Sequence, residues 1–237
     1  MYNKKMWTAA GCLADHRQVL LNLPNILGAY VGRYAIEPSL NESVMVTVNS
    51  ENSCPFCEGL HGELARMAGV ENVSTLMQAE SLQACQQISD ETAITYARLF
   101  AEGNGRGVRV EAAYGALASE EGIGRANSVQ ALCWFLLWGS LGGNTLNGFF
   151  ARFKGQGRRD SSVLFELIFT LFYGPLFLLI AVVNALLKFF PKVPAWFSAA
   201  FGVLLTHIAA LWIVPVGVLS FLLPGKPGVL ARKPAST

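Results

Sequence analysis

"LNESVMVTVNSENSCPFCEGLHGELARMAGV", residues 40–70, is the stretch that decides the fold. It places two cysteines three positions apart and a histidine four positions after the second cysteine. Pro55 follows the first cysteine, and proline is favoured at the first position of a helix. Gly69 is a typical residue at a helix end. The stretch therefore predicts a helix that begins at Pro55, directly after Cys54, and stops at Gly69.

The two thiols and the histidine share one face of that helix. Cys54 and Cys57 are three residues apart, and Cys57 and His61 are four apart, which are the spacings of neighbours on a helix surface. Cys57 falls in the first turn, where free N–H groups and the positive end of the helix dipole favour a thiolate. An imidazole one turn away can take its proton, and a second thiol can condense with the oxidised first one. This pattern indicates a working dithiol that reduces a peroxide.

Three other interpretations of these residues stay open at this point. A structural zinc site usually needs four ligands, and the fourth would have to be Glu42, Glu51 or a distant residue such as Cys85. A structural disulfide fits poorly with a cytoplasmic domain. The third alternative is an inert pair of core thiols, the interpretation we also give Cys85 and Cys133 because both lie in helical apolar patterns. With no second paired motif, we expect neither a bound metal nor a cofactor.

Two long apolar runs occupy the C-terminal third of a chain that is 52% hydrophobic and 14% charged. Residues 163–190 contain Glu166 and Lys188 as their charged residues, and residues 196–223 contain no Lys, Arg, Asp or Glu. As helices rising about 1.5 Å per residue, both are long enough to cross a hydrocarbon core about 30 Å thick. Soluble helices rarely run this long without a polar stripe. We therefore predict a two-span transmembrane hairpin with a tight connector at 191–195.

Lysine and arginine counts predict how this hairpin is oriented. Positive residues gather on its two flanks, before the first run and in the tail: Arg152, Lys154, Arg158, Arg159, Lys226, Arg232 and Lys233. The connector has only Lys188 and Lys192 beside it. Because positive charge is retained in the cytoplasm, we expect a cell (inner) membrane protein whose N-terminal domain and C-terminal tail are cytoplasmic. The net charge is +2 and no basic stripe with interleaved aromatics is present, so nucleic acid is not an expected partner.

The rest of the N-terminal part is also predicted to be helical. Apolar residues recur at helical spacing over residues 15–36, with Pro24 bending or splitting that helix. Further helices are predicted over residues 89–105, 107–122 and 125–153, and the last of these is mostly apolar. Local propensity leaves one segment undecided, because the Val and Thr residues after Ser43 suit either a strand or a buried helix face.

Glu42 stands twelve residues before Cys54, and with it the stretch resembles the core motif of the AhpD alkylhydroperoxidase and carboxymuconolactone decarboxylase family: Glu, eleven residues, Cys, two, Cys, three, His. The resemblance covers residues 17–150 and leaves the apolar hairpin outside. It implies an all-helical domain, and therefore a helix in the undecided segment. Glu51 is a second carboxylate that could substitute for Glu42, and its plainer interpretation is an exposed acid.

The resemblance also implies roles for the site residues. Cys57 corresponds to the nucleophile that attacks a peroxide, and Cys54 to the thiol that resolves the sulfenic acid as a disulfide. His61 corresponds to the base, and Glu42 to the residue that orients or recharges it. Phe56 departs from the family, where His or Tyr often precedes the second cysteine, so a proton-relay contribution from that position is absent. Lactone decarboxylation is the weaker implication, because that branch typically lacks the cysteine pair.

The sequence thus predicts an all-α chain made of an AhpD-like helical domain, a basic linker, a transmembrane hairpin and a cytoplasmic tail, over residues 1–152, 153–162, 163–224 and 225–237. We expect a membrane-anchored, thiol-dependent peroxidase or disulfide oxidoreductase. Its expected partners are a hydroperoxide, a dithiol reductant such as a lipoyl or thioredoxin-like protein, membrane lipid and, by resemblance, further copies of itself. The alternative is a non-catalytic accessory subunit of a membrane complex, with the AhpD-like domain as an interaction module.

Overall fold

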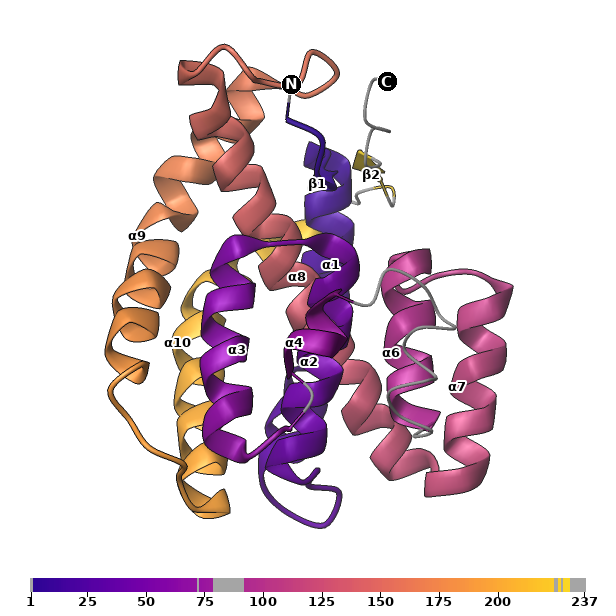
Figure 1. The fold of residues 1–237 in the computed structure, drawn as a ribbon. Helices are drawn as coiled ribbons and strands as arrows, with labels where there is room; N and C mark the ends of the chain where they lie inside the picture. The colour runs from indigo at the N-terminus through magenta and orange to yellow at the C-terminus, as the bar shows by residue number, and fades with distance from the viewer. Residues whose placement is uncertain (1, 72, 79–91, 224–225, 227, 231–237) are drawn as a thin grey trace.

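The structure is a computed structural model and describes residues 2–71, 73–78, 92–223, 226 and 228–230. The all-α prediction is confirmed, since one short strand pair is the only sheet among the described residues (Figure 1). The elements in chain order are β1 (Met6–Trp7), α1 (Ala9–Tyr30), α2 (Pro38–Asn52), α3 (Pro55–Ala68), α4 (Val73–Gln78), α6 (Thr92–Gly103), α7 (Val108–Glu121), α8 (Ile123–Phe153), α9 (Val163–Leu187), α10 (Ala195–Leu222) and β2 (Val229–Leu230).

Helices α2 and α3 meet at a left-handed turn. Ser53 ends α2 with φ 54° and ψ 41°, and Cys54 is the N-cap of α3. Pro55 takes the first helical position, and Gly69 ends the helix with φ 82°, a conformation that glycine adopts without strain. The predicted start and end of this helix are confirmed. The undecided segment lies inside α2, so helix and not strand forms there.

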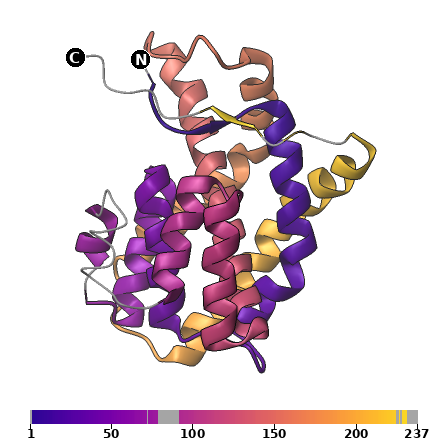
Figure 2. The same cartoon turned by 90° about the vertical axis from the view of Figure 1, so that its right-hand side faces the viewer.

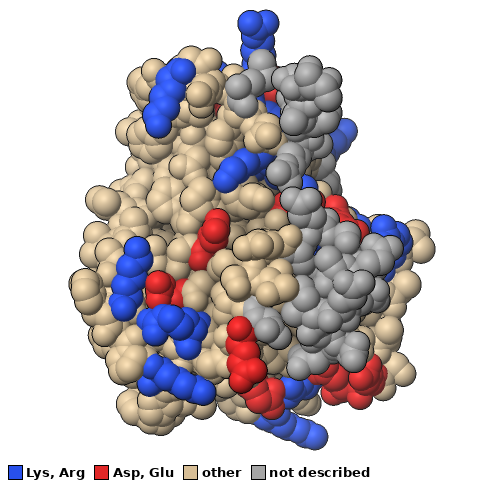
Figure 3. Space-filling view, in the orientation of Figure 1, with Lys and Arg blue, Asp and Glu red and all other residues tan. Residues whose placement is uncertain are grey.

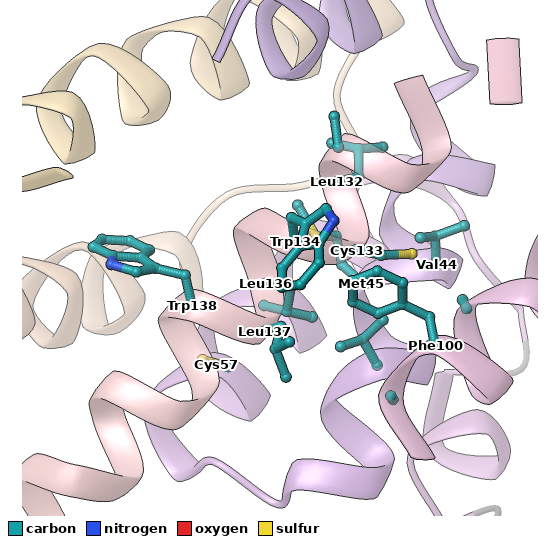
Figure 4. Packing of buried hydrophobic residues seen from close by; sticks show 14 of the residues in the cluster. Val44, Met45, Cys57, Phe100, Leu132, Cys133, Trp134, Leu136, Leu137 and Trp138 are labelled. Carbon is teal, nitrogen blue, oxygen red and sulfur yellow. The ribbon is translucent and has the colours of Figure 1, made fainter. Parts of the chain in front are cut away.

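The long helix α8 is the centre of the molecule and contacts α1, α2, α3, α6, α7 and α9. Its residues are buried around most of the circumference, because other helices cover nearly every side. Cys133 lies on the side of α8 that faces Val44, Met45 and Phe100, whereas Cys57 lies on the side of Trp138 (Figure 4). The prediction that Cys133 is a core thiol is confirmed, and its pKa is raised by burial.

Helices α9 and α10 are both long and apolar enough to cross a membrane, and 28% of the apolar window of each is buried inside the molecule. Helix α10 runs along α1, as Figure 2 shows, and α9 packs on α8 and α3. Their outward faces remain apolar and exposed, with large side chains such as Leu164, Leu171, Leu178, Leu186, Trp196, Leu211 and Leu222. A surface of this extent on a folded chain marks contact with lipid or protein.

The connector between α9 and α10 is fastened to the end of α3. The Arg66 guanidinium donates hydrogen bonds to the carbonyl oxygens of Leu187 (3.2 Å) and Phe190 (2.8 Å). The backbone N–H of Val193 donates to the carbonyl of Met67 at 3.1 Å. The helical part therefore lies alongside the apolar helices and not beyond one end of them. In Figure 3 charged side chains gather over α3 and the connector, while the area over much of α9 is free of charge.

Candidate active site

Asparagine side chains hold the turn that carries the thiol pair. The Asn49 side chain accepts a hydrogen bond from the Cys54 N–H at 3.1 Å and donates to the Cys54 carbonyl at 3.3 Å. From α8, Asn144 donates to the carbonyl of Asn52 at 2.7 Å. All of these groups are buried, where hydrogen bonds fix geometry strongly because an unmade one is costly. The turn before α3 is thus positioned from both α2 and α8.

The two thiols have different surroundings, and neither forms a disulfide. Cys54 is fully buried, and its sulfur lies so close to Gly143 of α8 that a Cβ on that glycine would be 2.5 Å from it. Cys57 is 6% exposed, and its sulfur would be 3.8 Å from a Cβ on Gly139. Cys57, and not Cys54, lines the cavity between α3, α8, α9 and α10. The second cysteine is therefore the thiol that a ligand in the cavity meets.

Of the two thiols, Cys54 is the more acidic. Burial opposes ionisation of Cys54, but its sulfur accepts hydrogen bonds from the Cys57 thiol and from the N–H groups of Cys57 and Phe56, and its pKa is lowered. The charge of Lys4 adds to this effect. The pKa of Cys57 is raised well above its usual value because its thiol donates to Cys54, and because burial and the Cys54 charge oppose a second thiolate. The prediction that the helix start lowers the pKa of Cys57 is wrong, since the N-cap sulfur receives those N–H groups.

His61 and Glu42 form the polar corner of the cavity. Nδ1 of His61 is 2.8 Å from Oε2 of Glu42, and both side chains are about 10% exposed. This contact fixes the imidazole ring and leaves Nε2 as the nitrogen for other groups. No direct hydrogen bond joins His61 to either thiol among the described residues, although Cys57, His61 and Glu42 all line the same cavity. A proton would pass between Cys57 and His61 after a small side-chain movement or through a water molecule.

The cavity itself has a volume of about 140 Å³ and walls that are almost entirely apolar. Aromatic and aliphatic side chains from α3, α8, α9 and α10 make most of its surface, among them Phe56, Phe135, Trp138, Phe177, Phe201 and Leu205. The predicted membrane helices therefore contribute half of a pocket whose other half carries the predicted catalytic residues. Phe56 contacts Phe177 of α9, with ring centroids 5.3 Å apart. Phe56, at which the sequence departs from the AhpD-like pattern, thus packs on the apolar hairpin.

Glu51 does not take part in this site. Its carboxylate is 2.8 Å from Lys5 Nζ and 3.1 Å from the guanidinium of Arg98, which is itself buried. The interpretation of Glu51 as an exposed acid is therefore wrong, because it is part of an ion-pair cluster that ties α2 to α6 and the N-terminus. Within the part of the chain that the structure describes, no three His, Cys, Asp or Glu side chains are grouped to hold a metal. Cys85, the distant ligand considered above, lies outside the described residues.

A second buried polar cluster was missed by the sequence reasoning. His16 of α1 is fully buried, with Nδ1 donating to the Cys12 carbonyl at 2.6 Å and Nε2 accepting from Trp138 Nε1 at 2.8 Å. The Tyr173 hydroxyl of α9 also contacts Nε2. Burial lowers the pKa of His16 to about 4, so the ring is neutral. The one available signal was a polar residue interrupting the apolar pattern of α1, which does not reveal its partners on α8 and α9.

Fold and site together define an all-α protein with a buried Cys-x-x-Cys-x-x-x-His motif, whose histidine is held by a glutamate and whose second thiol faces an apolar cavity. No protein-family model matches the chain, and no curated protein and no solved structure does either. The likeness to the AhpD family accordingly rests on the motif residues alone.

Proposed function

We propose that this chain is a thiol-dependent peroxidase in which Cys54 and Cys57 are oxidised to a disulfide by a hydroperoxide. The observation that carries the proposal is the division between the two thiols: Cys57 faces the cavity beside the His61–Glu42 pair, while Cys54 sits behind it with a lowered pKa. A nucleophile with access and a resolving thiolate three residues away are the two sulfurs that peroxide reduction requires.

The proposed reaction begins when the Cys57 thiol loses its proton, to Cys54 across their hydrogen bond or to His61. The Cys57 sulfur attacks one peroxide oxygen, the O–O bond breaks, and the leaving alkoxide takes the proton to become an alcohol. Cys57 is now a sulfenic acid, and the Cys54 thiolate attacks its sulfur, forming the S–S bond and releasing hydroxide, which takes a proton from solvent to become water. When His61 is the acceptor, Glu42 stabilises the imidazolium until the leaving alkoxide takes that proton.

A dithiol donor must then reduce the disulfide by thiol–disulfide exchange. With Cys54 fully buried and Cys57 6% exposed, the donor has to enter the cavity. A dithiol on a slender apolar arm, as in a lipoyl group, suits that approach better than the flat surface of a thioredoxin-like protein. Assembly into a homo-oligomer is part of the same proposal and rests on the family resemblance.

Membrane association is the second part of the proposal, supported by the exposed apolar faces of α9 and α10. The charge counts favour a cytoplasmic helical domain and tail, with the connector on the far side. The contact between α3 and the connector favours a different arrangement, because a full crossing would bring Glu58 and Glu63 of α3 to hydrocarbon depth at about 2.5–3.5 kcal/mol each. Labelling Lys192→Cys in sealed vesicles with an impermeant thiol reagent distinguishes a hairpin that crosses the membrane from one that does not. Labelling of this residue from the cytoplasmic side excludes a crossing.

The peroxidase proposal is tested by peroxide consumption by the full chain in detergent, with a dithiol donor present. Wild type should turn over, and Cys57→Ser should lose activity. Cys54→Ser should complete one turnover and accumulate a sulfenic acid, trapped by a dimedone-type reagent on Cys57. Cys133→Ser is the matched control and should keep wild-type activity. Full activity in Cys57→Ser would refute the proposal, and a large complex without any activity would favour the accessory subunit.

A further inference from the structure

The cavity beside Cys57 extends to the outer surface between the two apolar helices. The connector joins helices α9 and α10 at one end, and farther along Trp212 Nε1 donates to the Phe172 carbonyl at 2.9 Å and the Tyr173 hydroxyl donates to the Trp212 carbonyl at 3.2 Å. Between these places each helix packs mainly on the helical domain, α10 on α1 and α9 on α8 and α3. The stretch between them is where both helices line the cavity.

Two leucines mark the outer end of this opening. Leu179 of α9 lines the cavity and is 39% exposed, and Leu204 of α10 lines it and is 54% exposed. A side chain that both lines a cavity and reaches the outer surface forms the rim between the two. The rim lies on the apolar faces of α9 and α10, which are the faces proposed to contact lipid. The cavity thus opens sideways, toward hydrocarbon.

The chemistry of the walls decides what enters. Most of the cavity lining is apolar, so a polar ligand would lose hydrogen bonds to water there without replacing most of them. A hydrocarbon chain instead binds more tightly there, by about fourfold in affinity for each methylene that leaves water. The reactive thiol lies at the inner end, beside the one polar corner.

The geometry points to a lateral entrance between α9 and α10, through which the hydroperoxide of a long-chain lipid reaches Cys57 with the part of its chain next to the peroxide group in the cavity. This inference rests on the proposed peroxidase function and names its substrate class. The neighbouring part of the lipid chain stays in the apolar cavity, and the rest extends through the opening, while the O–O bond is broken at Cys57; the lipid alcohol leaves by the same opening. The apolar hairpin is then part of the substrate site and not merely an anchor.

The test compares hydroperoxides that differ in their chains on variants that narrow the opening. Leu179→Trp and Leu204→Trp fill the rim, and their matched controls are Leu178→Trp and Leu211→Trp, which lie on the same helices, are exposed and do not line the cavity. The full chain is assayed in detergent with linoleic acid hydroperoxide, tert-butyl hydroperoxide and hydrogen peroxide. Wild type should prefer the long-chain substrate in kcat/KM. The rim variants should lose about tenfold or more toward it and keep their rate with hydrogen peroxide.

A second readout is independent of turnover. The long-chain alcohol product should protect Cys57 of wild type and of both controls from alkylation, and protect it less in the rim variants. Turnover of hydrogen peroxide with no chain-length preference, or equal losses in rim and control variants, would overturn the lateral entrance and leave the peroxidase function standing. Absence of turnover with every hydroperoxide would overturn both.

Discussion

Gly143 and Gly139 offer a paired test of how closely the thiols lie against α8. A Cβ at Gly143 would be 2.5 Å from the Cys54 sulfur and 3.3 Å from both Phe56 and Phe177. The first distance is about 1 Å shorter than an ordinary contact. A Cβ at Gly139 would meet only the Cys57 sulfur, at an ordinary 3.8 Å. Both glycines lie inside the same helix, so the two alanine variants differ mainly in this contact.

The magnitudes follow from these distances. Replacing glycine by alanine inside a helix stabilises it by about 1 kcal/mol, and this gain applies at both positions. Overpacking of a tight core position costs about 1–3 kcal/mol, and this cost applies only at Gly143. Gly139→Ala should therefore be more stable than wild type by about 1 kcal/mol. Gly143→Ala should lie about 1–3 kcal/mol below Gly139→Ala, which corresponds to roughly 2–12 °C in melting temperature for a chain of this size.

Thermal unfolding of the reduced protein in detergent measures this difference. A double-mutant cycle with Cys54→Ala assigns it, because removing the sulfur should relieve most of the cost of Gly143→Ala and leave Gly139→Ala unaffected. Equal stability of the two glycine variants would refute the close seating of Cys54 on α8. A Gly143→Ala cost that persists without the sulfur would place the clash on the two phenylalanines instead.

Three further expectations concern the acids and histidines. His61→Ala should slow peroxide reduction at neutral pH by about 100- to 10,000-fold, and part of the loss should be recovered at alkaline pH. Glu42→Gln should act in the same direction but more weakly. A flat pH profile for both variants would exclude a role of this pair in proton transfer. Glu51→Gln should lower the free energy of unfolding by about 1.5–3 kcal/mol, because this carboxylate accepts hydrogen bonds from charged groups. Turnover per folded molecule should stay unchanged, because these contacts lie away from the thiols. Lost turnover would assign Glu51 to the active site. His16 has a pKa of about 4 in the folded protein and about 6.5 in the unfolded chain, so the unfolded state binds a proton first as the pH falls. The free energy of unfolding should therefore decrease by about 3 kcal/mol between about pH 6.5 and pH 4. Urea unfolding of His16→Gln should show a flatter pH dependence over this range.

Local sequence signals were sufficient for the helices and for much of the site. Pro55 marks the start of α3 and Gly69 its end, because proline and glycine act through their own backbone preferences, which need no partner. The spacing of Cys57 and His61 gives a shared helix face, and Glu42 lies one helix earlier in the same motif. These residues meet in space as that spacing requires.

The features that were not predicted depend on contacts between distant segments. Which thiol has the lower pKa is decided by the hydrogen bond from the Cys57 thiol, by the direction of two N–H groups and by Lys4, far from the motif in the chain. The partners of His16 come from α8 and α9, and the partners of Glu51 from the N-terminus and α6. Apolar composition indicated that α9 and α10 avoid water. It gave no information that their inner faces would line the cavity beside Cys57.

The position of α9 in the core also bears on how the protein is made and handled. Phe169 and Tyr173 of α9 belong to the same buried cluster as Trp7 and Trp138, near the beginning and the middle of the chain. A ribosome that has released only the first half of the polypeptide has produced the α3 side of the cavity but none of the sides formed by α8, α9 and α10, so the thiols stay open to cellular oxidants until the last helices emerge. For the same reason, an expression fragment cut at the basic linker would expose two tryptophans and the Cys57 sulfur, and we expect it to aggregate and cross-link.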